Sequence, residues 1–237
     1  MSARTARRLA ALATRFDLPA GAVPALDALL ELIATDPTAP TTITDPGTAV
    51  DAHVADALVA LELDEVRRAR RIADLGSGAG FPGLVLAAAL PEAQVSLVES
   101  SSKKCAFLAH AAEVMALGNV EAIPARAEDW AAGVGRCDLV TARAVAPLNV
   151  LVEYAAPLLA EGGALLAWKG RREPGAEADG DAAAAATGLA PARVRRVQPW
   201  KGADRLHLHL YLKVGSTPNR YPRRPGMASK RPIRAST

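Results

Sequence analysis

One stretch decides the fold of this chain, Ile72-Ala73-Asp74-Leu75-Gly76-Ser77-Gly78-Ala79-Gly80-Phe81-Pro82-Gly83. Its apolar start predicts a strand, its alternating glycines predict a tight turn, and Pro82 suits the first turn of a following helix. Parallel sheets bind nucleotide-like ligands at such a turn. The spacing excludes a dinucleotide fingerprint, which needs glycine where Phe81 stands, and no Lys-Ser or Lys-Thr pair closes a phosphate-binding P-loop.

A second acid supports the interpretation of this turn as a ligand site. Residues 94–99 predict an apolar strand that ends in Glu99, 19 residues after Gly80. An acid at that place accepts hydrogen bonds from ribose hydroxyls in nucleotide-binding α/β sheets. Glycines that serve packing alone are the alternative. We expect an adenosine-containing ligand, with these candidate contacts: Asp74, Gly76, Gly78, Gly80 and Glu99.

Strands and helices alternate from residue 71 onward, which predicts an α/β fold with a mostly parallel sheet and helices on both faces. The last two strands are separated by five residues, and the final one alternates polar and apolar residues, so they form an antiparallel hairpin. A seven-stranded Rossmann-like sheet of this kind is typical of S-adenosylmethionine-dependent methyltransferases. The expected strands are 71–75, 94–99, 120–125, 137–142, 163–169, 193–199 and 205–214, and the expected helices are 82–90, 102–117, 127–132, 147–160 and 176–187.

Three segments follow from this pattern. Residues 1–65 carry apolar residues at three- and four-residue spacing around a loop at 36–46, which predicts an N-terminal helical extension. Residues 66–215 form the expected methyltransferase domain. Residues 216–237 form a basic C-terminal tail.

Composition excludes several classes of protein. Half of the residues are hydrophobic, which supports a packed core, yet no apolar stretch reaches the roughly 18 to 20 residues of a membrane helix. Two cysteines, Cys105 and Cys137, are too few for a disulfide framework, and we expect both thiols to be reduced and buried. Four scattered histidines and no cysteine pair at ligand spacing give no reason to expect a metal site. We expect a cytoplasmic protein.

The net charge of +3 hides an asymmetry between the two parts of the chain. Residues 189–237 hold twelve Lys or Arg and one acid, a net charge of +11, so residues 1–188 carry −8. A basic terminal region on an acidic domain is the electrostatic footprint of a protein that binds a polyanion. A solubilising terminus is the alternative.

Four stretches together resemble one family, the bacterial small-subunit ribosomal RNA guanine-N7 methyltransferases called RsmG or GidB. The Phe-Pro-Gly extension after the glycines is more specific than the generic methyltransferase turn, and the order and spacing agree over about residues 70–170. The chain departs from many members at Ala39-Pro40-Thr41 and at Ala52-His53, where an Asn-Leu-Thr run and an Arg-His pair are common. The four stretches are Asp74-Leu-Gly-Ser-Gly-Ala-Gly-Phe-Pro-Gly83, Arg126-Ala-Glu128, Thr141-Ala-Arg-Ala144 and Ala167-Trp-Lys-Gly170.

The resemblance implies that Gly76 and Phe81 contact the cofactor S-adenosylmethionine, that Ala127 and Glu128 line its adenine side, and that Arg143 lies at the site. Phe81 can cover a methylsulfonium surface. Arg143 ends a strand in the same crevice, where an arginine can pair with the methionine carboxylate or with an RNA phosphate, and a surface arginine is the alternative. Lys169 closes the next strand and is a candidate for the RNA side.

The acceptor atom follows from the same resemblance and from chemistry. N7 of guanine carries a lone pair and no proton, so it can attack the activated methyl group directly without a catalytic base, and positioning suffices. We therefore expect Arg143 and Lys169 to be the residues nearest the reaction. The expected partner is small-subunit ribosomal RNA or an assembling ribosomal particle, bound by a monomer. Methylation of another RNA, a small molecule or a protein is the alternative.

The basic tail suggests how the RNA is held. Arg and Lys residues between 220 and 234 alternate with Tyr221, so they could bind phosphates and stack on a base. If the tail supplies much of the affinity, deletion of residues 218–237 lowers the salt dependence of RNA binding.

Overall fold

The computed structural model describes residues 2–236, so Met1 and Thr237, the first residue of the expected extension and the last residue of the expected tail, lie outside it. Seven strands form one sheet in the order β3-β2-β1-β4-β5-β7-β6, and β7 runs antiparallel to both of its neighbours. The predicted mostly parallel sheet with a final hairpin is therefore confirmed. The strands are β1 (Arg71–Leu75), β2 (Gln94–Val98), β3 (Val120–Ile123), β4 (Cys137–Arg143), β5 (Leu159–Lys169), β6 (Leu189–Val197) and β7 (Leu206–Lys213).

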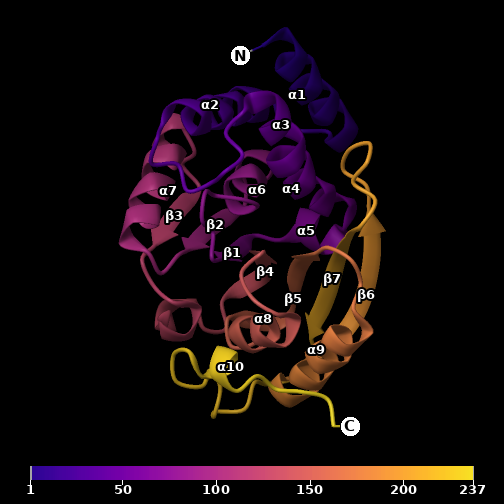
Figure 1. Ribbon diagram of the computed structural model, residues 1–237. Helices are drawn as coiled ribbons and strands as arrows, with labels where there is room; N and C mark the ends of the chain where they lie inside the picture. The colour runs from indigo at the N-terminus through magenta and orange to yellow at the C-terminus, as the bar shows by residue number, and fades with distance from the viewer. Residues whose placement is uncertain (1, 237) are drawn as a thin grey trace.

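Helices cover both faces of this sheet (Figure 1). One face packs against α6 (Gly83–Ala89), α7 (Ser102–Val114) and the N-terminal helices, around buried side chains such as Ile72 and Leu166. The other face packs against α8 (Leu148–Ala155) and α9 (Pro174–Thr187). Apolar cores on both faces therefore fix the sheet. The candidate site described below lies at the carboxyl ends of its strands.

The N-terminal segment is helical with a loop at residues 36–45, close to the prediction. Residues 50–55 form a single π-helical stretch, a form that is frequent at functional sites. The elements are α1 (Ala3–Phe16), α2 (Ala22–Thr35), α3 (Pro46–Ala49), η1 (Val50–Ala55), α4 (Asp56–Leu58), η2 (Val59–Glu62) and α5 (Asp64–Arg68).

Several predicted boundaries were wrong. β6 begins four residues early, at Leu189, because it is the edge strand, where a register shift tolerates Pro191. β5 likewise begins at Leu159, which pairs with Cys137 across a register shift. The expected helix at 127–132 is two short 3₁₀ turns, η3 (Ala127–Asp129) and η4 (Ala131–Gly133), and the expected helices at 102–117 and 147–160 end at Val114 and Ala155.

The C-terminal segment, residues 216–236, lies against α8 and α9 and includes the short helix α10 (Met227–Lys230) (Figure 1). Arg223 forms an ion pair with the buried Glu153 of α8, and the Nδ2 of Asn149 donates to the carbonyl of Ile233 at 2.6 Å. This segment is thus docked on the domain. Of the twelve cations in residues 189–237, six lie in or between β6 and β7.

No helix in the described part of the chain is long and apolar enough to cross a membrane.

Candidate active site

The glycine-rich turn after β1 adopts a backbone that requires glycine. Gly76, Gly78 and Gly80 have φ angles of +64°, +55° and +94°. A Cβ on Gly76 would lie 2.6 Å from a methyl carbon of Val145, and one on Gly80 would lie 2.2 Å from Leu84. A Cβ on Gly78 would have no neighbour nearer than 3.8 Å, so a side chain would meet no clash at this position. Packing therefore explains two of the glycines, whereas at Gly78 only the positive φ requires one.

Asp74, at the end of β1, fixes this turn through buried hydrogen bonds. Its side chain is fully buried, and its two oxygens accept hydrogen bonds from the hydroxyl of Thr141 at 2.8 Å and from the backbone N–H of Gly83 at 3.2 Å. Burial raises the pKa of Asp74 to about 6. The carboxyl group thus ties β1 to β4 and to the start of α6. In this arrangement Asp74 shapes the turn and does not face the open side.

Glu99 lies beside the open side of the turn. Its carboxylate accepts from the backbone N–H of Gly78 at 3.2 Å and from that of Ser101 at 2.9 Å. The residue keeps 6% of its surface exposed. The acid at the end of β2 therefore meets the glycine whose Cβ position is open, as the two sequence signals suggested.

Arg143, at the end of β4, is bound by the N-terminal helices. Its guanidinium donates to the carboxylate of Asp56 at 2.8 Å, to the carbonyl of Ala52 at 3.1 Å and to Nδ1 of His53 at 3.3 Å. The Arg143 side chain is 18% exposed. The indole N–H of Trp168 donates to the backbone carbonyl of Asp56 at 2.9 Å. Arg143 is therefore a partly buried partner of the N-terminal helices and not a free surface arginine.

An aromatic stack joins these groups to the glycine turn. The rings of His53 and Phe81 are stacked, with centroids 4.3 Å apart and an interplanar angle of 16°. The guanidinium of Arg143 lies 5.5 Å from the centroid of the Phe81 ring. Phe81 is thus held by a cation and an imidazole, and it orients the end of the turn.

The ionisation of this cluster follows from its burial. Burial, and then the neighbouring Arg143, lower the pKa of His53 to about 4. His53 is therefore neutral at pH 7, accepts from Arg143 at Nδ1 and donates from Nε2 to the hydroxyl of Thr41, 3.1 Å away. Burial raises the pKa of Asp56, and its Oδ1 atom is buried with no hydrogen-bond partner among the described residues.

The remaining expected site residues lie around the same edge of the sheet. The ammonium group of Lys169 donates to the carbonyl of Ala146 at 2.6 Å, and burial lowers its pKa. Lys169 therefore holds the loop after β4. Glu128 accepts from the backbone N–H of Gly226 in the C-terminal segment at 3.0 Å, and Ala127 packs against the apolar core of the α8 face.

Sequence reasoning missed Asp56, the ion-pair partner of Arg143. His53 entered it only as one of the four scattered histidines and in the pair Ala52-His53, where the family commonly has Arg-His. The available signal was that His53 and Asp56 are three residues apart in a helical segment, which places both side chains on one face.

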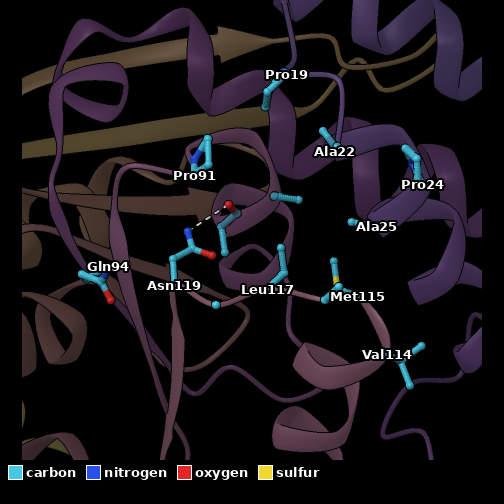
Figure 2. A pocket seen from close by; sticks show the side chains of 15 residues that line it. Pro19, Ala22, Pro24, Ala25, Pro91, Gln94, Val114, Met115, Leu117 and Asn119 are labelled. Atoms are coloured by element: carbon cyan, nitrogen blue, oxygen red, sulfur yellow. Dashed lines mark hydrogen bonds between the residues drawn. The ribbon is translucent and has the colours of Figure 1, made fainter.

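A cavity of about 730 Å³ lies elsewhere, between α2, the end of α6 and the loop after α7 (Figure 2). Gln94 starts β2 and Asn119 precedes β3, so the cavity is at the amino ends of the strands. Its walls are mostly apolar and carry no charged residue, and the amide N–H of Asn119 is bound to the carbonyl of Ala87 at 3.1 Å. The charged and polar residues described above therefore lie at the other end of the strands, the carboxyl end.

Solved structures place this architecture in a class. A protein from Agrobacterium tumefaciens described as a predicted O-methyltransferase has a TM-score of 0.54 and 25% identity, over 70% of this chain and 81% of that one. A SAM-dependent methyltransferase from Aquifex aeolicus has a TM-score of 0.56 at 14% identity, over 70% of this chain and 93% of the other. The chain has the fold of S-adenosylmethionine-dependent methyltransferases.

The family is more specific than the class. The family model described as rRNA small subunit methyltransferase G, or GidB, matches residues 30–201. Proteins named ribosomal RNA small subunit methyltransferase G are 42% identical in Rubrobacter xylanophilus, over 80% of this chain and 75% of that one, and 36% identical in Moorella thermoacetica, over 81% and 82%. The chain belongs to the GidB family, and the predicted resemblance is confirmed.

Proposed function

We propose that this chain transfers the methyl group of S-adenosylmethionine to N7 of a guanine in small-subunit (16S) ribosomal RNA by direct displacement. The observation that carries the proposal is the match of the GidB family model over residues 30–201. The glycine turn at the carboxyl edge of a methyltransferase sheet supports it independently.

The residues present fit this cofactor. No side chain crowds the Cα of Gly78, and the carboxylate of Glu99 beside it suits a ribose diol. The ring of Phe81 lies at the end of the turn, where it suits a sulfonium. We assign the adenine side to η3, which holds Ala127 and Glu128. Asp74 shapes the turn through its hydrogen bonds to Thr141 and Gly83, and Gly76 and Gly80 shape it through their positive φ angles.

When bound, S-adenosylmethionine supplies a methyl group activated by its sulfonium. The chain then has to position a guanine, because N7 carries a free lone pair and no proton has to be removed first. Arg143 joins the end of β4 to the N-terminal helices through Asp56, and Lys169 fixes the loop after β4 through Ala146; we assign both residues to the acceptor side. N7 lies in the deep major groove of A-form RNA, so the target guanine is unpaired.

The partner belongs to this proposal as well. We infer that a monomer binds small-subunit ribosomal RNA or an assembling particle, and that the exposed cations of residues 216–236 contribute. Because Arg223 neutralises the buried Glu153, deletion of the segment would also damage the fold. Substitution of Arg224, Lys230, Arg231 and Arg234 by Gln is the cleaner variant for RNA binding, since all four are exposed.

The test supplies labelled S-adenosylmethionine with unmodified 16S ribosomal RNA, or with small ribosomal subunits, and maps the methylated base. We expect N7-methylguanine at one unpaired position. Label in adenine or cytosine, in protein or in a small molecule would contradict the proposal.

A variant at the cofactor site adds a second measurement. Glu99→Ala removes a carboxylate that accepts two backbone hydrogen bonds, and we expect it to weaken binding of S-adenosylmethionine by about tenfold or more in calorimetry. Glu121→Ala, at an exposed position of the neighbouring strand β3, is the matched control with unchanged affinity.

A further inference from the structure

The turn between β6 and β7, residues 198–205, lies at the same edge of the sheet as the candidate active site. Lys169 at the carboxyl end of β5 pairs with His207 near the start of β7. His207 also pairs with Arg196 near the end of β6. The turn between β6 and β7 therefore lies at the carboxyl ends of the parallel strands, as the glycine turn does. Within the sheet it lies at the β6 side, and β3 and η3 lie at the other side.

Helix α1 packs on this turn, although almost the whole chain separates them (Figure 1). The guanidinium of Arg8 donates to the carbonyl of Pro199 at 3.2 Å, and that of Arg15 donates to the same carbonyl at 3.4 Å. Glu62 accepts from both Arg15 and Arg195, at 2.8 and 2.6 Å. These contacts join α1 and the turn into one continuous surface, called here the α1–turn surface.

The α1–turn surface has a surplus of positive charge. Helix α1 contains four arginines and no acid, and Arg4 and Arg7 lie on the face opposite an apolar stripe of Leu9, Leu12 and Phe16. Arg8 is paired with Asp51, and Arg15 and Arg195 with Glu62. Four exposed cations make no ion pair with any residue in 2–236: Arg4, Arg7, Lys201 and Arg205.

We propose that the α1–turn surface binds phosphates of the RNA that carries the acceptor guanine. This inference rests on the proposed function and adds a binding surface to it. Charge complementarity favours a polyanion, and the position at the edge of the active site favours the polyanion that bears the substrate base. The C-terminal segment reaches the site from the η3 side, so the two basic regions flank it.

The test measures how the affinity for unmodified 16S ribosomal RNA depends on salt. In the surface variant, Arg4, Arg7, Lys201 and Arg205 are all replaced by Gln. The control variant loses the same charge at the opposite edge, through Gln at the exposed positions Arg68, Arg70, Arg71 and Arg136. Two of these control arginines form exposed ion pairs of little energetic weight.

We expect the slope of log affinity against log salt to fall by about 3 in the surface variant, since each phosphate contact contributes about 0.7 to 0.9. The control variant keeps the slope of the wild type, and both variants keep its affinity for S-adenosylmethionine. An unchanged slope in the surface variant, or an equal fall in both variants, would overturn the proposal. If the surface variant loses binding to anionic lipid vesicles but keeps wild-type binding to RNA, the surface binds membranes, and the proposal is overturned as well.

The wild-type protein separates this outcome from failure of the proposed function. A wild type that methylates the RNA while the surface variant keeps its slope overturns the α1–turn surface alone. A wild type that neither binds nor methylates the RNA overturns the proposed function and the surface with it.

Discussion

The two segments that flank the methyltransferase sheet both reach the candidate active site, but they contact it in different ways. The N-terminal segment contacts the end of β4 with side chains, through the ion pair of Asp56 with Arg143 and the stack of His53 on Phe81. The two ionisable side chains that it contributes there, His53 and Asp56, are buried.

The C-terminal segment contacts the site with its backbone. The N–H of Gly226 reaches Glu128, while the segment's own ion pair, from Arg223 to Glu153, lies on α8. The N-terminal contact is therefore part of the structure of the candidate site, whereas the C-terminal contact attaches a segment at its periphery. Disruption of the first should disturb the site, and disruption of the second should mainly release the segment.

Asp56→Ala should have the largest effect. It leaves the guanidinium of Arg143, which is 18% exposed, without its carboxylate. Removal of one partner of a buried pair costs about 3 to 5 kcal/mol, and we expect about 3 kcal/mol in the free energy of unfolding because some solvent reaches Arg143. Methyl transfer should fall as well, since the end of β4 loses its support.

Chemical denaturation and a methyl-transfer assay check this expectation. Asp56→Asn keeps the shape and one acceptor oxygen, so it should lose less than Asp56→Ala. If Asp56→Ala unfolds at the denaturant concentration of the wild type, the N-terminal contact is no more structural than the C-terminal one.

Arg223→Ala should have an intermediate effect. It leaves Glu153, whose side chain is 2% exposed, without its partner, but the segment can detach and let water reach the carboxylate. We expect a loss of about 2 kcal/mol in the free energy of unfolding, below the usual cost of a broken buried pair. Trypsin should then cleave faster within residues 216–236.

Arg224→Ala is the matched control, because Arg224 is exposed and its side chain has no bonded partner among residues 2–236. Equal trypsin cleavage in both variants would show that the ion pair does not hold the segment. A large loss of affinity for S-adenosylmethionine in Arg223→Ala alone would make the C-terminal contact part of the site.

The sequence predicts those features of the fold and of the candidate site that depend on residues close together in the chain. The glycine turn, the acid at Glu99 and the succession of strands and helices along the chain follow from short patterns whose members are neighbours in the chain. The ion pair of Arg143 joins residues 87 apart, and that of Arg223 joins residues 70 apart, so no local pattern reports them. A basic terminus has the same composition whether it is free or docked, so composition predicts a tail and does not predict that it packs on α8 and α9.

At pH 7, where the imidazole is neutral, substitution of His53 should give the smallest effect of the three, and its pH dependence tests how much of the N-terminal contact depends on charge. Its pKa is lowered from 6.5 to about 4 by burial and by Arg143. Between these values the unfolded chain binds a proton that the folded protein does not, so the stability from neutral His53 is full above pH 6.5 and is lost as the pH falls toward 4.

We expect the free energy of unfolding to fall with decreasing pH in this window by up to about 1.4 kcal/mol per pH unit more steeply in the wild type than in His53→Gln. Asp74, whose pKa is raised to about 6, acts in the opposite direction but is present in both proteins, so its contribution cancels in the difference. Denaturation series between pH 4 and 7 measure the two slopes. Coincident slopes would mean that His53 is protonated as easily as in the unfolded chain, which is incompatible with its accepting a hydrogen bond from Arg143, and the N-terminal contact would then depend on Asp56 alone.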